Sequence, residues 1–159
     1  MRIIGIDPGY ERLGIAVVEK NKGEKEVLIH SECFKTSPKD PHGLRLFQIK
    51  KRIEEIISEF KPDDLSIEAL FFNTNQKTAI MVAEARGVIL ASAVEKGLDV
   101  FEYTPPQIKL SVTGYGKSDK VQIIKMIPML ISITKNIKHD DEYDAIAVGL
   151  TFFAHYRFP

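Results

Sequence analysis

The stretch IGIDPGYERLG, residues 4–14, decides the fold and raises the first chemical question. An almost unbroken apolar run ends on a carboxylate, Asp7, and a Pro-Gly pair follows at once. This pattern predicts a strand over residues 2–7, a tight turn and a return strand over residues 13–20. A carboxylate at the end of a central strand is costly to desolvate unless something neutralises it. The rest of the sequence therefore has to supply a partner for Asp7.

The order of the predicted elements indicates one α/β domain. The 159 residues contain no long linker rich in Pro, Gly or Ser, so we expect a single compact domain over residues 1–159. A third strand over residues 26–36 completes an antiparallel meander, and two short apolar strands, each preceded by a helix, follow it. We therefore expect a mixed five-stranded sheet, three antiparallel strands and then parallel additions, with helices on both faces. The later elements are strands at residues 65–69 and 99–104, helices at 41–60, 78–96, 105–112 and 140–156, and a helix that Ser118 caps and Pro128 interrupts.

Composition and charge narrow the class of protein. The 22 basic and 22 acidic residues argue against an all-over cationic surface, but residues 103–138 hold six lysines and one acid, whereas residues 139–144 hold four acids. The single cysteine, Cys33, cannot form an internal disulfide and is expected to be a small strand residue. Residues 1–20 lack the pattern of a secretory signal. Because the longest apolar stretch, residues 145–154, is too short to span a bilayer, we expect a cytoplasmic protein with no membrane association.

Four carboxylates are predicted to meet at one edge of this sheet. Asp7 ends the first strand and Glu68 ends the fourth, and two parallel neighbouring strands bring their ends to the same edge. Asp141 and Asp144 lie three positions apart in the last helix and share a helix face. We call Asp7, Glu68, Asp141 and Asp144 the carboxylate tetrad. The tetrad's face of the last helix continues through Val148, Thr151 and His155, and the predicted packing face carries Tyr143, Ile146, Ala147, Leu150 and Ala154.

Converging carboxylates repel one another unless a cation lies between them. Oxygen-only ligands suit Mg²⁺ or Mn²⁺, and two such ions roughly 3.5–4 Å apart can activate a water molecule and stabilise the leaving oxygen in phosphodiester hydrolysis. Taken one at a time, each acid also has an ordinary structural explanation, as a turn former, a strand-end charge or an acid at a helix N-terminus. The convergence of all four favours a metal site over these separate explanations. We leave Asp140 and Glu142 out of the predicted site, because neither shares the helix face as well. We also leave out His139, for which a metal ligand and a helix-capping residue are both open interpretations.

Several motifs together resemble the RuvC family. RuvC is the bacterial Holliday-junction resolvase of the ribonuclease H-like superfamily. This chain resembles it in four motifs, in the same order and at compatible length: IGIDPGYERLG, SIEALFFNTN with AEARG, FEYTPPQIKLSVTGYGKSDK and DDEYDAIAVGL. The resemblance implies a ribonuclease H-like fold, with the tetrad as the metal-binding catalytic residues. It also implies a homodimer that uses Mg²⁺ to nick two opposed strands of a four-way junction, with the RuvA–RuvB branch-migration complex as partner. The family often has Gln after the catalytic Glu, where this chain has Ala69.

The DNA-binding residues are predicted from the same motifs. Phe71 closely follows Glu68, and an aromatic ring beside a phosphate-cutting site can stack on an unpaired base. The alternative is that this ring caps the core, but the resemblance places Phe71 at the family's junction-contacting aromatic. Lys109 and Lys120 match family lysines that contact DNA, and Lys117 lies close enough to help. The alternative for each lysine is a solvated surface position.

Other functions stay open at this point. The pattern D-x-G-x-x-x-x-G is also the phosphate loop of actin-like and sugar-kinase-like ATPases, but these proteins bind ATP between two such domains, and 159 residues leave no room for a second one. A nuclease of the same superfamily could act instead on an RNA–DNA hybrid or a structured RNA, and the carboxylates do not distinguish these substrates. A junction-binding protein without catalytic activity is a third alternative, against which the intact tetrad argues.

Overall fold

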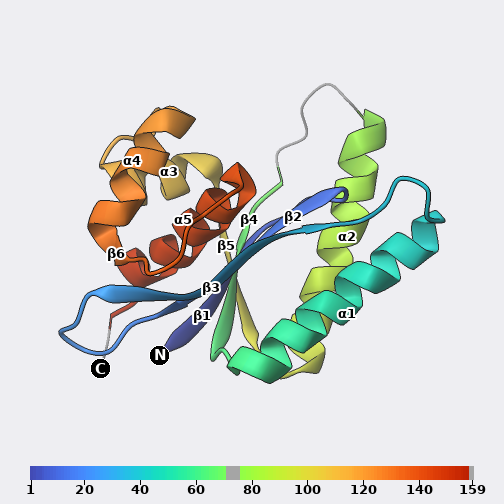
Figure 1. Ribbon diagram of the computed structural model, residues 1–159, viewed down its shortest axis with the longest axis horizontal. Coiled ribbons are helices and arrows are strands. Elements are labelled where there is room, and N and C mark those ends of the chain that lie inside the picture. Colours follow the sequence, from blue (N-terminus) through green and yellow to red (C-terminus); the bar gives the residue numbers. More distant parts are fainter. Residues whose placement is uncertain (71–75, 158–159) are drawn as a thin grey trace.

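The computed structural model describes residues 1–70 and 76–157, and shows one sheet covered by helices on both faces (Figure 1). The sheet has six strands in the order β5-β4-β1-β2-β3-β6. The strands are β1 (Arg2–Asp7), β2 (Arg12–Glu19), β3 (Glu26–Lys35), β4 (Asp64–Glu68), β5 (Asp99–Tyr103) and β6 (Ile131–Ser132). The helices are α1 (His42–Phe60), α2 (Gln76–Glu95), α3 (Pro105–Thr113), α4 (Lys120–Leu130) and α5 (Asp140–His155). Within the two described ranges, no helix combines the length and the apolar character needed to cross a bilayer.

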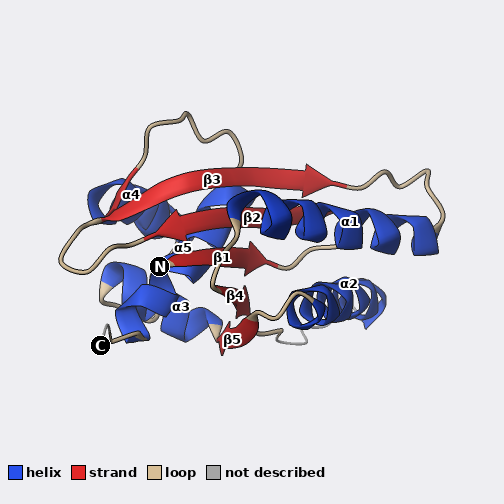
Figure 2. Ribbon diagram, turned by 90° about the horizontal axis from the view of Figure 1, so that it is seen from below, coloured by secondary structure: helices blue, strands red, loops and turns tan. Residues whose placement is uncertain are grey.

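The central strands confirm the predicted topology. β1, β2 and β3 form an antiparallel meander, and β4 and β5 extend the sheet in parallel on the other side of β1 (Figure 2). The prediction of five strands was wrong, because β6 pairs in parallel with the start of β3 at Glu26 and Val27. This sixth strand has two residues and follows α4 directly. It is too short to show the alternation that marks a strand in a sequence.

The apolar run of β1 supplies two cores, one on each face of the sheet. Figure 1 shows α1 and α2 on one face, and α3, α4 and α5 on the other. Successive strand residues point to opposite faces, so Ile3 packs under α3, α4 and α5, whereas Ile4 and Ile6 pack under α1 and α2. All three side chains are fully buried. Burial on both faces explains why this strand is continuously apolar and does not alternate.

α5 is buried on nearly all sides, between the sheet and the helices α3 and α4. Every residue from 145 to 153 is buried. The predicted division into faces was therefore wrong: Val148 and Thr151, on the tetrad's face, are fully buried, and Ala154, on the predicted packing face, is exposed. The close approach of helix and sheet requires Gly5, because a Cβ atom there would lie 2.4 Å from a carbonyl oxygen of α5.

The start and the interior of α4 also differ from prediction. The N-cap is Asp119, which accepts a hydrogen bond from the backbone N–H of Gln122 at 2.8 Å, and the Gln122 side chain accepts one from the Asp119 N–H at 2.9 Å. Ser118 donates instead to the carbonyl oxygen of Tyr115, at 2.7 Å. Pro128 does not interrupt the helix: α4 runs through it to Leu130, and beyond the proline the N–H of Ile131 still donates to the carbonyl oxygen of Ile127.

Candidate active site

Two carboxylates of the tetrad come from neighbouring parallel strands. Asp7 is the last residue of β1, and Glu68 is the last residue of β4. Ile6 and Ile67 are register partners, so the acid that follows each of them lies at the same level of the sheet. Arg86 of α2 donates a hydrogen bond to the carbonyl oxygen of Glu68 at 3.4 Å and so fastens this end of β4. The structure thus brings both carboxylates to one edge of the sheet, as the strand order predicts.

The first turns of α5 bring Asp141 and Asp144 to the same edge. The residue of β2 opposite Asp7 is Gly14. A Cβ atom on Gly14 would lie 2.2 Å from the carbonyl oxygen of Asp141 and 3.0 Å from the Cβ atom of Asp7. Only a glycine allows α5 to begin this close to the end of β1. This close approach explains the glycine that ends the IGIDPGYERLG stretch.

The electrostatics show that the four carboxylates act on one another. Burial and, after it, the negative charges of Asp144, Glu68 and Asp141 raise the pKa of Asp7 to about 8. Burial and the charge of Asp144 raise the pKa of Glu68, and burial raises the pKa of Asp144. Mutual repulsion of this kind marks a site that needs positive charge, and carboxylate oxygens are the ligands that hard divalent cations prefer. The tetrad therefore fits a divalent metal ion both by its charge and by its donor atoms.

Two cations lie against the acids of α5. Lys120 Nζ donates to Asp144 at 2.8 Å and to Asp140 at 2.7 Å. Arg12 donates through Nε to Asp141 at 3.0 Å and through Nη2 to Asp140 at 2.8 Å. Among the residues that the structure describes, no three His, Cys, Asp or Glu side chains stand close enough together to hold one metal ion. In this arrangement Arg12 and Lys120 neutralise part of the charge that a metal ion would balance.

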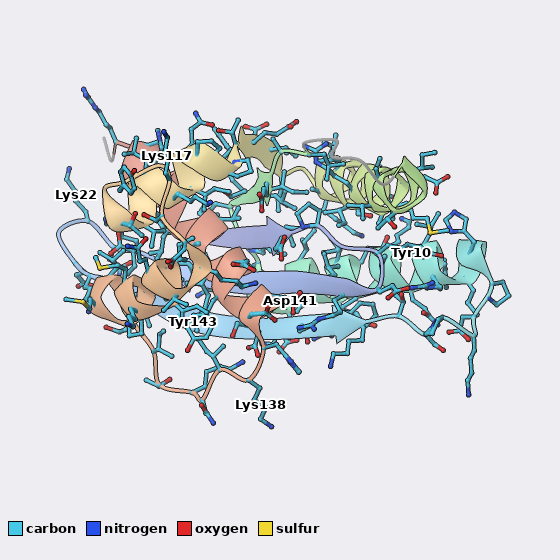
Figure 3. The ribbon with its side chains drawn as sticks, turned by 90° about the horizontal axis from the view of Figure 1, so that it is seen from above. Tyr10, Lys22, Lys117, Lys138, Asp141 and Tyr143 are labelled. Carbon is cyan, nitrogen blue, oxygen red and sulfur yellow. The ribbon has the colours of Figure 1, made fainter. Side chains whose placement is uncertain are left out.

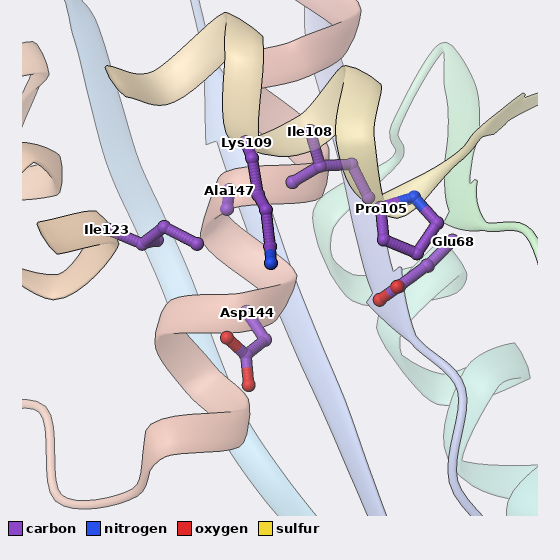
Figure 4. Close-up of a pocket in the computed structure, with 7 residues that line it drawn as sticks. All are labelled: Glu68, Pro105, Ile108, Lys109, Ile123, Asp144 and Ala147. Carbon is purple, nitrogen blue, oxygen red and sulfur yellow. The ribbon is translucent and has the colours of Figure 1, made fainter. Parts of the chain in front are cut away.

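Lys109 reaches the same site from α3. A pocket of about 90 Å³ is lined by Glu68, Pro105, Ile108, Lys109, Ile123, Asp144 and Ala147. Figure 4 shows the Lys109 side chain extending from α3 toward the space between the carboxylates of Glu68 and Asp144. Its positive charge opposes the rise in the pKa of Glu68. The lysine that the sequence predicts as a DNA contact therefore lies within the carboxylate site itself.

The other predicted DNA contacts are distributed differently. Lys120 lies against the tetrad, as described above. Lys117 is exposed in the loop between α3 and α4, and Figure 3 shows it well apart from Asp141. Phe71 lies outside the described residues.

Sequence reasoning missed two residues of this site. Asp140 does not share the tetrad's helix face, yet hydrogen bonding to Lys120 and the charge of Arg12 lower its pKa to about 2. Arg12 belongs to the first motif, IGIDPGYERLG, which predicts no role for this residue. A signal was present, because Arg12 lies two positions before Gly14 in a strand and therefore shares its face.

Glu142 and His139 have structural roles beside the tetrad. The buried carboxylate of Glu142 accepts hydrogen bonds from Ser31 Oγ at 2.6 Å, from Lys135 Nζ at 2.9 Å and from the backbone N–H of His139 at 3.2 Å. His139 is the N-cap residue of α5. Glu142 thus ties the start of α5 to β3 and to the segment that precedes the helix.

Comparison with known proteins identifies the family. The family model described as Crossover junction endodeoxyribonuclease RuvC matches residues 3–152. The chain is 44% identical over 150 residues to the crossover junction endodeoxyribonuclease RuvC of Alkaliphilus metalliredigens, and this alignment covers 94% of this chain and 91% of that protein. It is 41% identical over 150 residues to the RuvC of Caldicellulosiruptor saccharolyticus, and that alignment covers 94% of this chain and 90% of that protein. The structure of T. thermophilus RuvC in complex with Holliday junction substrate matches with a TM-score of 0.91 and 32% identity, covering 98% of this chain and 94% of that chain. The chain therefore belongs to the RuvC family of crossover junction endodeoxyribonucleases.

Proposed function

We propose that this chain resolves four-way DNA junctions by paired, metal-dependent nicks in two opposed strands, during recombination and DNA repair. Membership of the family supports this activity, and so does the structural match to T. thermophilus RuvC, which was solved with Holliday junction substrate. The observation that carries the proposal is the placement of the tetrad: Asp7 and Glu68 end neighbouring parallel strands, and α5 begins at the same edge with Asp141 and Asp144. In this proposal residues 1–159 act as one nuclease domain.

The tetrad is proposed to bind the metal and to be catalytic. Mg²⁺ is the proposed ion, two per active site, and Mn²⁺ can substitute for it, because all four donors are carboxylates. Bound ions supply an activated water molecule and stabilise the leaving oxygen of the phosphodiester. All four carboxylates belong to regular structure, two at strand ends and two at the start of a buried helix. This rigid support keeps the side chains in place against their mutual repulsion.

Lysines around the tetrad are proposed to contact DNA phosphates. Lys109 extends into the pocket of Glu68 and Asp144, where its charge offsets the negative potential that would otherwise repel a phosphate. Lys120 offers a second positive charge at the same edge, and the exposed Lys117 offers a third further along the surface. Phe71 is proposed to stack on a base that is unpaired at the junction.

α2 is proposed to form the interface of a homodimer. A four-way junction needs two cuts and one tetrad supplies one, so a dimer with two-fold symmetry would present two equivalent sites. Ile80 and Val94 of α2 are large apolar side chains with 59% and 64% of their surface exposed. They lie 14 positions apart, close to four helical turns, and therefore share one face of the helix. The RuvA–RuvB complex as partner and the cytoplasm as site of action are proposed from the family resemblance alone.

A cleavage assay on four substrates tests the proposed activity. The purified protein is incubated with a labelled four-way junction, duplex DNA, an RNA–DNA hybrid and single-stranded DNA, each with and without Mg²⁺. The junction should be nicked in two opposed strands, and only with Mg²⁺. Preferential cutting of the hybrid, or nicking that a chelator does not stop, would refute the proposal. The control is Glu68→Gln, which removes charge at nearly constant shape and should bind the junction without nicking it.

A further inference from the structure

Asp140 holds two cations at once beside the tetrad. Its Oδ1 accepts a hydrogen bond from Arg12 Nη2 at 2.8 Å, and its Oδ2 accepts one from Lys120 Nζ at 2.7 Å. Each of these cations also contacts one acid of the tetrad, Arg12 at Asp141 and Lys120 at Asp144. Asp140 is not a tetrad member, and 49% of its side chain is exposed. It therefore lies at the rim of the site and bridges the two cations.

Arg12 occupies an oxygen atom that a metal ion would use. Both Nε, at 3.0 Å, and Nη2 of Arg12 donate to Oδ2 of Asp141. Only 17% of the Asp141 side chain is exposed, so solvent screens this pair incompletely. The thiol of Cys33 lies against the same pair. A divalent cation that takes this oxygen of Asp141 as a ligand has to displace the guanidinium.

The backbone of Arg12 is held in place, whereas its side chain has room to move. Arg12 opens β2 and is the register partner of Lys35 in β3. The turn before it is fixed by Thr36, whose hydroxyl donates to the carbonyl oxygen of Tyr10 at 2.7 Å, and by Arg45, whose guanidinium lies 3.8 Å from the centre of the Tyr10 ring. The side chain of Arg12 is 47% exposed. It can therefore turn from the carboxylates toward solvent without a change in the fold.

The charge of the site decides which partner Arg12 takes. Without metal, the carboxylates of Asp140 and Asp141 attract the guanidinium. Divalent charge on the tetrad repels it, whereas a DNA phosphate presents two oxygens that match its planar fork. We propose that Arg12 competes with the divalent cation for Asp141 and becomes a phosphate contact of the junction once the cation is bound. This inference rests on the proposed function, because it requires a tetrad that binds metal and a chain that binds junction DNA.

Metal binding without DNA tests the competition. Mn²⁺ alone is titrated into the full chain in a calorimeter, for the wild type, Arg12→Gln and Lys35→Gln. Arg12→Gln should bind Mn²⁺ about three- to fivefold more tightly than the wild type, because the competing charge is gone. Lys35→Gln removes an equal charge from the neighbouring strand position and should stay within about twofold of the wild type. Equal affinities of the two variants, or weaker binding by Arg12→Gln, would overturn the competition.

Junction binding tests the new contact. The affinity is measured at several salt concentrations in a Glu68→Gln background, which prevents nicking, with Mn²⁺ at a concentration that calorimetry shows to saturate this variant. Adding Arg12→Gln should reduce the slope of log affinity against log salt by about one unit, the amount expected for one lost phosphate contact. An unchanged slope would overturn the proposed phosphate contact.

Asp141→Asn separates a failure of this inference from a failure of the proposed function. If the wild type binds Mn²⁺ and Asp141→Asn does not, the tetrad is a metal site. An Arg12→Gln variant whose affinity for Mn²⁺ equals that of the wild type then refutes only the proposed role of Arg12. If the wild type binds no Mn²⁺, both proposals fail. Thermal unfolding confirms that each variant is folded. Arg12→Lys serves as a second variant: it keeps the charge and should keep an affinity for Mn²⁺ near that of the wild type, whereas tightening equal to that of Arg12→Gln would contradict the competition.

Discussion

Gly14 faces Asp7 across the β1–β2 ladder, and the backbone of α5 lies so close that a Cβ atom on Gly14 would be 2.2 Å from the Asp141 carbonyl oxygen. An alanine at this position must push α5 away from β1 and so move Asp141 away from Asp7. We expect Gly14→Ala to lose most of its nicking activity and about 1–3 kcal/mol of its free energy of unfolding, the usual cost of overpacking. Nicking rates at saturating junction and unfolding in denaturant measure the two effects.

Gly43 of α1 provides the matched control for this change. Nothing lies within 4 Å of the position that its Cβ atom would take. Gly43→Ala should keep full nicking activity and gain about 0.4–1 kcal/mol of stability, because the unfolded chain loses conformational freedom. If Gly14→Ala nicked as fast as Gly43→Ala, the contact between β2 and α5 would not set the geometry of the site.

Asp7 is predicted to destabilise the metal-free protein. Because its pKa is raised from 3.8 to about 8, the folded protein holds a proton that the unfolded chain releases between these two values. The free energy of unfolding should therefore fall as the pH rises from about 4 to about 8. In the presence of a chelator, Asp7→Asn should flatten this pH dependence and raise the free energy of unfolding at neutral pH by on the order of a few kcal/mol.

The same variant should lose Mg²⁺-dependent nicking while it keeps junction binding. Urea unfolding with chelator, repeated at several pH values between about 5 and 8, measures the stability effect. A pH dependence equal to that of the wild type would show that Asp7 titrates normally. Stabilisation together with loss of nicking would show that this carboxylate is kept for chemistry at the expense of stability.

Local patterns were enough to predict the meander and the edge at which Asp7 and Glu68 meet. The continuous apolar run of β1 and the order of the elements fix both, because parallel neighbours place their ends together. The burial of α5 was readable from its own sequence, because residues 145–154 form a continuous apolar stretch and a helix that is apolar all round is a buried one. The predicted division into faces was wrong because it treated α5 as an amphipathic helix with one solvent face. The pairing of Arg12 with Asp140 joins positions 128 apart, and no local periodicity carries such a contact.

Lys135 is predicted to stabilise the start of α5 through Glu142. Its Nζ lies 2.9 Å from a carboxylate that is almost completely buried, so removing the lysine leaves that charge with only neutral hydrogen-bond donors. Lys135→Met should lower the free energy of unfolding by about 1–2 kcal/mol. This cost is smaller than that of breaking a fully buried ion pair, because the lysine is itself partly exposed. Lys138→Met removes an equal charge from an exposed position of the same segment and should change stability by less than about 0.5 kcal/mol. Denaturant unfolding compares the two, and equal losses would mean that the pair with Glu142 contributes nothing specific.

Lys109 is predicted to act in both binding and chemistry, because it lies in the pocket of Glu68 and Asp144. Lys109→Gln should weaken junction binding on all sequences alike, reduce the salt slope by about one unit and also lower the nicking rate at saturating substrate. Lys125→Gln removes an exposed lysine of α4 and should leave the nicking rate unchanged. A Lys109→Gln variant whose loss is confined to binding would place this lysine among the ordinary phosphate contacts.

The proposed dimer is tested at Ile80 on α2. A charge on the exposed apolar face of α2 cannot be buried in an interface without a large desolvation cost, so Ile80→Asp should separate the protomers. Sedimentation of the wild type should give about twice the chain mass of 18.0 kDa, and Ile80→Asp should give the mass of one chain. Val121→Asp is the matched control, because Val121 of α4 is equally exposed, at 58% against 59%, but lies on the other side of the sheet. On a supercoiled plasmid with an extruded cruciform, the wild type should yield linear product directly, since both nicks fall within the lifetime of one complex. Ile80→Asp should release nicked circles. If Ile80→Asp stays dimeric, or if a monomer still yields linear product without nicked circles, then α2 does not form the interface or the two cuts do not require it.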